Sequence, residues 1–222
     1  TMTANGTIGE ATDHLEIRSS NAARGWVSAA APLGIYLDQT EGDLVLRTVA
    51  ARTGGLATGD VSLTALDGSI VNEVDDTAVR VIGVSIDLFA TGGHIGSADG
   101  SADIRVDTAT AGRLVAEGED GVFVTEASGP LTLLLGASSA GSVRITVPFA
   151  GGTGADLTLL ASGDTVDGSR SIAVGGADAF GRVELRAGND VLAPLGTLIR
   201  GTQVIVRTAV GQNPAAPVGT TA

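Results

Sequence analysis

One stretch of this chain occurs twice, and this repeat constrains the fold more than any other feature of the sequence. Residues 93–135, moved back by 87 positions, align without a gap on residues 6–48. A fixed-period repeat built on glycine and aliphatic residues is typical of a stacked, repetitive architecture. The identical pairs include Gly6/Gly93, Ile8/Ile95, Gly9/Gly96, Ile17/Ile104, Arg18/Arg105, Gly25/Gly112, Gly34/Gly121, Gly42/Gly129, Leu44/Leu131 and Leu46/Leu133.

Short segments of alternating apolar and polar residues recur along the chain, and such alternation predicts half-buried strands. The steps between them are too long for hairpin loops, and no stretch has the pattern of a crossover helix. The step from Val143 to Val183 is about twice the usual one and leaves room for one further coil, from residues 157–159 or 172–174. The segments are centred on Ile17, Ile35, Val61, Ile86, Ile104, Val122, Val143, Val183 and Val204.

These spacings predict an all-β solenoid over residues 1–208, with about ten coils of roughly 20 residues, in which the 87-residue repeat equals four coils. The composition agrees with this prediction, because aromatic residues make up only 3% of the chain and there are 33 glycines. Small and branched apolar residues suit a narrow interior, and glycines suit many tight turns. Residues 209–222 are rich in Pro, Ala and Gly and are predicted to be a linker or tail.

The charge balance and the cysteine count exclude several classes of protein. The formal net charge is −12, which disfavours nucleic acid as a partner. The longest apolar run is too short to cross a bilayer, so we expect no membrane insertion. With no cysteine, the chain has neither disulfides nor zinc–thiolate sites. Under the 87-residue shift residues 1–5 fall on the end of a strand, so we expect the chain to be a piece of a longer one.

The phrases G-x-I-G, L-E-I-R, G-I-Y-L and G-D-L-V-L, followed by G-D-V-S-L-T-A-L-D-G-S-I, resemble the repeats of filamentous-haemagglutinin-like adhesins and related giant bacterial surface proteins. The resemblance covers residues 6–70 and 84–135 and, more loosely, 183–207. It implies a right-handed parallel β-helix, export across the outer membrane, and adhesion or display at the cell surface. Such families carry an N-terminal secretion module with an N-P-N-type motif. Here the only Asn-Pro is Asn213-Pro214, in the predicted tail, so this segment would belong to the shaft of such a protein and not to its secretion module.

The resemblance also sets the expected partners and function. The partners would be a host or neighbouring-cell surface, or other copies of the chain end to end. The chain would be a non-catalytic structural segment that acts as a rigid shaft of a secreted adhesin or filament.

Calcium is the one cofactor for which the sequence offers a candidate site. Residues 151–156 (GGTGAD) match the first six positions of the calcium-binding nonapeptide G-G-x-G-x-D-x-U-x, and residues 188–192 form a partial copy. Asp156 and Asp190 are therefore candidate ligands, since Ca²⁺ prefers oxygen. This hypothesis describes a calcium-stabilised, RTX-like secreted module. However, Thr158 stands where the nonapeptide has a large apolar residue, and an ordinary glycine-rich turn is the alternative.

Three acidic clusters suggest another alternative, a carbohydrate-active β-helix enzyme such as a polysaccharide lyase or hydrolase, because paired carboxylates can cleave glycosidic bonds. Acidic residues on every turn are also what a solvated surface carries by default. The chain has no Lys, no Cys and no G-x-S-x-G motif, so we expect it not to be an enzyme. The clusters are Asp99/Asp103/Asp107, Glu117/Glu119/Asp120 and Glu73/Asp75/Asp76.

Aromatic residues supply the last candidates. Trp26 aligns with Arg113 in the repeat, which indicates an exposed position and makes Trp26 the candidate partner-binding residue. Tyr36 and Phe123 are repeat equivalents, and this equivalence predicts a stacking ladder along the rod.

Overall fold

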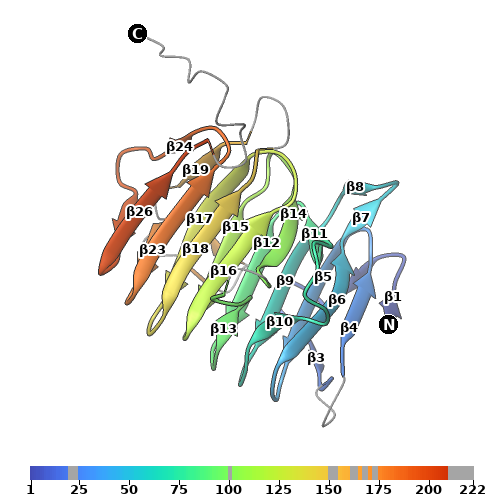
Figure 1. Ribbon diagram of the computed structural model, residues 1–222. Helices are drawn as coiled ribbons and strands as arrows, with labels where there is room; N and C mark the ends of the chain where they lie inside the picture. The colour runs from blue at the N-terminus through green and yellow to red at the C-terminus, as the bar shows by residue number, and fades with distance from the viewer. Residues whose placement is uncertain are drawn as a thin grey trace.

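The computed structural model describes residues 1–19, 25–99, 102–149, 155–160, 165–166, 170–171 and 175–209. These residues form strands, turns and connecting segments without a helix, as the sequence predicts. Most strands belong to two large sheets, called sheet A and sheet B here, and the chain alternates between them as it advances from one end of the molecule to the other (Figure 1). Among the described residues no helix is long and apolar enough to cross a membrane.

Sheet A contains nine strands in a continuous row and two more beside it. The row is β1 (Met2–Thr3), β4 (Val27–Ala30), β6 (Leu44–Ala50), β10 (Ile70–Asn72), β13 (His94–Ile95), β16 (Gly121–Glu126), β18 (Ser142–Val147), β23 (Arg182–Ala187) and β26 (Gln203–Arg207). The two others are β11 (Val81–Gly83) and β14 (Ile104–Thr108).

Sheet B contains eight strands in a row and three beside it. The row is β2 (Thr7–Ile8), β5 (Gly34–Gln39), β9 (Asp60–Ala65), β12 (Ile86–Ala90), β15 (Leu114–Gly118), β17 (Leu131–Ser138), β19 (Leu157–Leu159) and β24 (Val191–Leu192). The others are β3 (Leu15–Ile17), β22 (Gly176–Ala179) and β25 (Leu198–Arg200). Two small antiparallel pairs stand apart, β7 (Arg52–Thr53) with β8 (Leu56–Ala57) and β20 (Thr165–Val166) with β21 (Arg170–Ser171).

All neighbours within the two large sheets are parallel, which confirms the predicted stacking of strands and is compatible with a β-solenoid. Ile35 pairs with Val61 and Val61 with Ile86, so these steps of the sequence pattern are true full circuits. In sheet A, Val122 pairs with Val143 in the same way. The alternating pattern therefore places its strands correctly in both sheets.

The predicted coil length is too short for most of the rod. Paired residues give the true length of a circuit, and pairs such as Met2 with Ala29 and Ile86 with Leu114 are further apart in sequence than the predicted coil. Ile17 and Ile104 do not begin new coils. Strands β2 and β3 both pair with the same edge of β5, so they belong to one coil. Strands β13 and β14 likewise both pair with the same edge of β16. The continuous row of sheet A contains nine stacked strands, where about ten coils were predicted.

The long step from Val143 to Val183 holds no additional coil, because these two residues pair directly. Two strands from this step, β19 and β22, lie end to end along β17. Its first part pairs with β19, and its last part pairs with β22. Residues 157–159 thus form a strand as expected, and residues 172–174 lie outside the described residues.

The two copies of the repeat lie on opposite sheets. Ile8 is in sheet B and its equivalent Ile95 is in sheet A. From Ile8 the chain makes three circuits to reach Ile86, and Ile95 follows half a circuit later. The offset of the repeat is therefore three and a half circuits, where four coils were expected. Local detail is conserved nevertheless, since β4 and β15 pair with their next neighbours through the same register shift.

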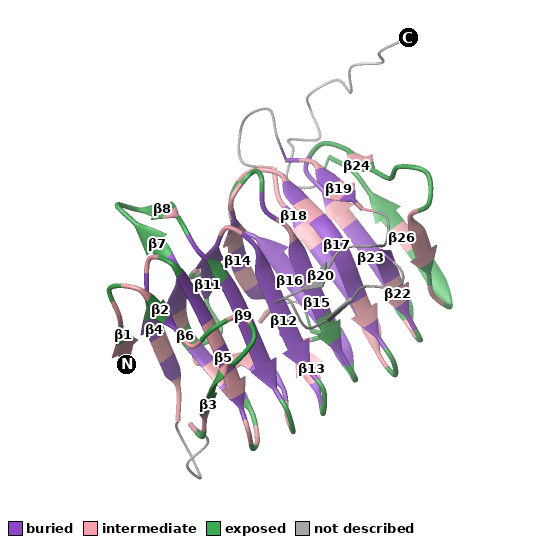
Figure 2. Cartoon of the chain, turned by 180° about the vertical axis from the view of Figure 1, so that it is seen from behind, coloured by how far each residue is buried: buried purple, intermediate pink, exposed green. Residues whose placement is uncertain are grey.

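The core is one aliphatic column between the sheets. It runs from Ile8 to Ala187 and consists of inward-facing Ile, Leu, Val and Ala side chains, most of them fully buried (Figure 2). The inward positions of one strand stack on those of the next, because parallel pairing is in register. A second, smaller cluster lies on the outer face of sheet B and contains Phe89, Val115, Leu134 and Leu135.

Candidate functional site

A groove of about 990 Å³ runs along sheet B at the carboxyl ends of its strands. Five successive strands, β12, β15, β17, β22 and β25, line it, and each contributes its last outward residues and the turn that follows. The first row of lining residues is Phe89, Glu117, Ala137, Asp178 and Arg200, and the second row, two residues later, is Thr91, Glu119, Ser139, Phe180 and Thr202.

The register of the strands explains this arrangement. Phe89 pairs with Glu117, Glu117 with Ala137, Ala137 with Asp178, and Asp178 with Arg200. The lining residues of one strand are called a rung here. With about 4.8 Å between neighbouring strands, the five rungs span about 19 Å along the axis. The middle rung carries only the small side chains of Ala137 and Ser139, so the surface is hollow there.

The groove combines exposed acceptors with an aromatic ring. Glu117 and Glu119 are exposed, and Phe180 is 71% exposed. At the far rung the Arg200 Nε donates to Asp178 Oδ1 at 2.9 Å, and this hydrogen bond raises the pKa of Arg200. Carboxylates, hydroxyls and an aromatic face together suit a polyhydroxylated ligand, which donates hydrogen bonds and packs its C–H faces on a ring.

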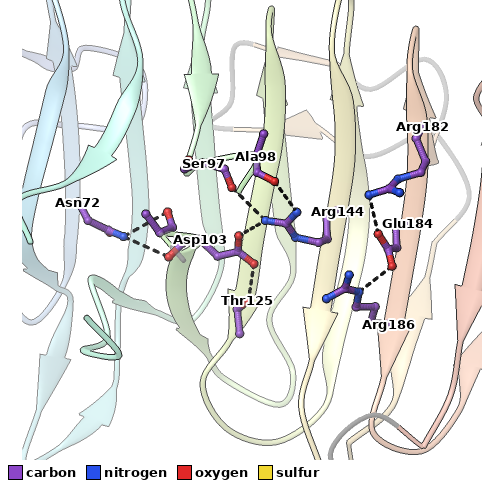
Figure 3. A network of polar contacts seen from close by, with 10 residues as sticks. Asn72, Ser97, Ala98, Asp103, Thr125, Arg144, Arg182, Glu184 and Arg186 are labelled. Atoms are coloured by element: carbon purple, nitrogen blue, oxygen red, sulfur yellow. Dashed lines mark hydrogen bonds and ion pairs between the residues drawn. The ribbon is translucent and has the colours of Figure 1, made fainter. Parts of the chain in front are cut away.

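The predicted acidic cluster around Asp103 is not part of this groove. Asp103 lies at the start of β14 on sheet A, where its carboxylate forms an ion pair with Arg144 and accepts a hydrogen bond from Thr125 Oγ1 at 2.9 Å (Figure 3). Arg144 also donates to the carbonyls of Ser97 and Ala98 at 2.9 and 3.1 Å. Asp103 and Glu119 therefore lie on different sheets and do not form a pair of carboxylates.

The third acidic cluster is also held in ion pairs. Glu73 accepts hydrogen bonds from Arg47, one of them at 2.7 Å, and these bonds lower the pKa of Glu73 and raise that of Arg47. Asp76 pairs with the buried Arg80 at 2.6 Å. Both clusters fasten strands and loops of sheet A to each other.

Trp26 is only partly exposed. The guanidinium of Arg47 lies over its ring, 3.7 Å from the centroid. A cation stacked on an indole ring stabilises this surface of sheet A. Binding of a partner by Trp26 stays a prediction, and a partner would have to displace Arg47 or stack on the other face of the ring.

The predicted ladder of Tyr36 and Phe123 is wrong, because the half-circuit offset of the repeat puts them on different sheets. Tyr36 lies beside His14, with 5.8 Å between ring centroids. Phe123 lies under Arg144, with 4.9 Å from the guanidinium carbon to the ring. Each ring has taken a local polar partner instead of the other ring.

Asp156 and Asp190 come close together, as the calcium hypothesis requires. Asp156 Oδ1 accepts hydrogen bonds from Asn189 Nδ2 at 2.7 Å and from the Asp190 N–H at 3.1 Å. Residues 151–154, the glycine-rich part of the motif, lie outside the described residues. Over the described ranges, no group of three or more His, Cys, Asp or Glu side chains could hold a metal ion. Calcium binding stays a prediction.

Two buried carboxylates were not recognised from the sequence. Burial raises the pKa of Glu126 to about 8, although hydrogen bonds from Thr108 and the Ser128 N–H act in the opposite direction. Burial also acts to raise the pKa of Glu184, but a hydrogen bond from Arg186 and the charges of Arg182 and Arg207 lower it overall (Figure 3). In the sequence these residues look like ordinary exposed acids on alternating strands.

Three groove residues, Asp178, Phe180 and Arg200, were also missed. The only signal was their place at the ends of strand-like segments, and it can be interpreted only when the register between strands is known. No family model matches this chain, and no match is found among curated proteins or solved structures.

Proposed function

We propose that this chain is a non-catalytic structural segment, a right-handed β-solenoid that acts as the rigid shaft of a secreted bacterial surface adhesin or filament. The observation that carries the proposal is the unbroken succession of parallel pairs in sheet A from Met2 to Arg207 around one aliphatic core. Backbone hydrogen bonds between neighbouring strands run along the axis of such a rod, so bending or stretching it breaks many bonds together.

Polar contacts on the outer face of sheet A add to this rigidity. Arg144 ties β18 to the loop before β14, and Asn72 Nδ2 donates to the Asp103 carbonyl at 3.2 Å (Figure 3). Both contacts join residues that are far apart in the sequence. Three guanidinium groups, one of them from the neighbouring strand β26, surround Glu184 near the far end of the same face.

Adhesion, secretion and location at the cell surface are part of the proposal and rest on the resemblance of the repeat to adhesin shafts. A shaft of this kind holds a binding domain away from the cell. Its acidic surface, with a formal charge of −12, keeps the apolar-cored rod soluble.

The distance between the two ends tests the shaft. The chain has no cysteine, so Thr3→Cys and Thr208→Cys together give two unique dye sites. The nine stacked strands in the row of sheet A, about 4.8 Å apart, predict an end-to-end separation of about 38 Å. Single-molecule energy transfer should give one narrow distance distribution. A broad or multiple distribution would contradict a rigid shaft.

A second candidate function is glycan binding in the groove of sheet B, favoured by the exposed ring of Phe180 between acceptor-rich rungs. Affinity electrophoresis with neutral and amino-sugar polysaccharides tests it. Phe180→Ala should abolish the retardation, and Leu56→Ala, at an exposed leucine on the β7–β8 hairpin, should leave it unchanged. Release of reducing ends from the same polymers would instead support the carbohydrate-active enzyme.

A further inference from the structure

The groove on sheet B repeats the same three positions on each of its five strands. In-register pairing places every rung directly beside the next, and the strands that carry them lie side by side (Figure 2). A straight trough with one unit every 4.8 Å or about that therefore runs along the axis of the rod. Between the two rows each rung has a small residue, and these residues are Ala90, Gly118, Ser138, Ala179 and Gly201.

One wall of this trough is open to a ligand, because all five residues of the second row are exposed. Every rung carries a side-chain oxygen that can accept a hydrogen bond, and the fourth rung adds the ring of Phe180. The Thr91 hydroxyl donates to the Leu66 carbonyl at 2.7 Å, so its lone pairs can accept. The oxygens belong to Thr91, Glu119, Ser139, Asp178 and Thr202.

The charge of the lining disfavours acidic ligands. Three carboxylates and one guanidinium line the groove, so its formal charge is −2. Asp178 is neutralised by its ion pair with Arg200, and the charges that remain are those of the exposed Glu117 and Glu119. Such a surface repels an anionic polymer, whereas a neutral or amino-substituted polymer can approach it.

The backbone of the strands around the groove is already paired. Strands β12, β15, β17 and β22 each have parallel neighbours on both sides. A peptide that binds by strand addition needs a free strand edge, but the groove lies on the face of the sheet. Side chains must therefore hold the ligand, and most of them accept hydrogen bonds. A polymer of hydroxyl groups suits them better than a peptide, whose main chain has an acceptor for every donor.

The spacing of the rungs matches an extended glycan. A pyranose unit with two equatorial linkages advances by about one strand spacing, so sugars and rungs stay nearly in step along the groove. The five rungs span about 19 Å, which accommodates about five such sugars. An α-1,4-linked chain curves into a helix, so it leaves a straight groove after a few units.

We propose that the groove binds an extended, equatorially linked glycan without acidic groups, parallel to the rod axis and with one sugar for each rung. This inference rests on the second candidate function, glycan binding, and names the shape and length of the ligand. Phe180 packs on the C–H face of one sugar, and Glu119, two rungs away, accepts hydrogen bonds from the hydroxyls of another. Ala137 and Ser139 leave room for the sugar between them.

Calorimetric titration of the full chain with two series of glucose oligomers tests the proposal. In the β-1,4-linked series, from cellobiose to cellohexaose, the affinity should rise with each sugar up to cellopentaose and then stay constant. The gain from cellobiose to cellopentaose should be at least about tenfold, because each added sugar contacts a further rung. Maltopentaose has the same composition but a curved shape, so it should bind at least about tenfold more weakly than cellopentaose.

The Ser139→Leu variant should abolish the dependence on length. Its branched side chain fills the hollow of the middle rung and divides the groove, so cellopentaose should bind no better than cellobiose. Ser139 is exposed, so the fold tolerates the larger side chain. Thr77→Leu places the same side chain on an exposed loop between β10 and β11 and should leave all titrations unchanged.

The outcomes separate this inference from glycan binding itself. Equal affinities for cellopentaose and maltopentaose, no dependence on length, or no binding of either series would each overturn the inference. Retardation by polysaccharides that depends on Phe180 would still support glycan binding in those cases, and its absence would remove that function as well. Tighter binding of pentalysine than of any glycan would overturn the inference in favour of a basic peptide.

Discussion

Gln39 and Glu126 occupy the same position of the 87-residue repeat, and both side chains are completely buried. Gln39 Oε1 accepts hydrogen bonds from Ser19, and its Nε2 donates to the Glu41 carbonyl at 2.7 Å. Glu126 accepts from the Thr108 N–H at 3.2 Å and from the Thr108 hydroxyl at 2.9 Å. One fold position is thus filled by a neutral amide in one copy and by a titratable acid in the other.

We expect the stability of the protein to fall as pH rises from about 4.5 to about 8, because of Glu126. Burial raises the pKa of Glu126 from 4.5 to about 8, so in this range the folded chain holds a proton that the unfolded chain has released. At about 1.4 kcal/mol for each pKa unit, the loss amounts to about 5 kcal/mol. Urea unfolding of the Glu126→Gln variant should show a much weaker dependence on pH in this range.

The reverse substitution is the matched control for this prediction. Gln39→Glu introduces a carboxyl at the equivalent buried site, so it should create a new loss of stability with rising pH. Identical pH profiles of the original chain and the Glu126→Gln variant would mean that Glu126 is ionised in the folded protein.

Removing Arg144 should destabilise the rod strongly. Its side chain is 7% exposed and is the ion-pair partner of Asp103, which is 12% exposed, so Arg144→Met leaves a largely buried carboxylate without its ion-pair partner. Such a change costs about 3–5 kcal/mol. Arg200→Met, which breaks an ion pair whose arginine is 69% exposed, should change the free energy of unfolding very little, because solvent screens such a pair. Equal losses in chemical denaturation would contradict a structural role for the buried network.

Glycine is required at the one position in each copy of the repeat that lies against the backbone carbonyl of an aromatic residue. Gly9 and Gly96 have φ angles of +70° and +71°, and a Cβ at either position would lie 2.3 Å from the carbonyl oxygen of Tyr36 or Phe123. Gly96→Ala should therefore cost more than about 2 kcal/mol in urea unfolding. At Gly129 φ is +78° but nothing lies within 4 Å of a Cβ, so Gly129→Ala should cost only about 1 kcal/mol.

Asp156 should stabilise the last coils even in a chelating buffer. Asp156→Ala removes the acceptor of the Asn189 side chain and of the Asp190 N–H, and we expect a loss of about 1–2 kcal/mol. Repeating the thermal melts with Ca²⁺ tests the calcium hypothesis separately. A rise in Tm with Ca²⁺ that disappears in Asp156→Ala would support it, and no rise in the original chain would contradict it.

The strands could be predicted from the sequence, but their assignment to coils could not. Residues such as Ile35, Val61 and Ile86 alternate with polar neighbours, and this pattern depends only on an inside and an outside. Strands of sheet A and sheet B satisfy it equally, so the spacing between Ile86 and Ile104 suggests a full coil although it joins strands of different sheets. Only the hydrogen-bonded partners distinguish a half circuit from a whole one.

The groove residues were hidden for a related reason. Glu117 and Glu119 were recognised as an acidic cluster because they are neighbours in sequence. Phe180 and Arg200 join them only through a register that accumulates over several strands, and each loop along the way changes it. The burial of Glu126 likewise depends on what lies on the neighbouring coil.

The half-circuit offset of the repeat makes the duplication act like a screw operation that turns each copy to the opposite side of the rod. Tyr36, for example, points outward from sheet B in the first copy, whereas its repeat equivalent Phe123 lies on sheet A, on the opposite side of the rod. Further duplications of the same length would alternate sides, so they would decorate both flanks evenly. A binding surface that had to be repeated along one flank would require a unit twice as long, or an insertion that restores a whole number of turns.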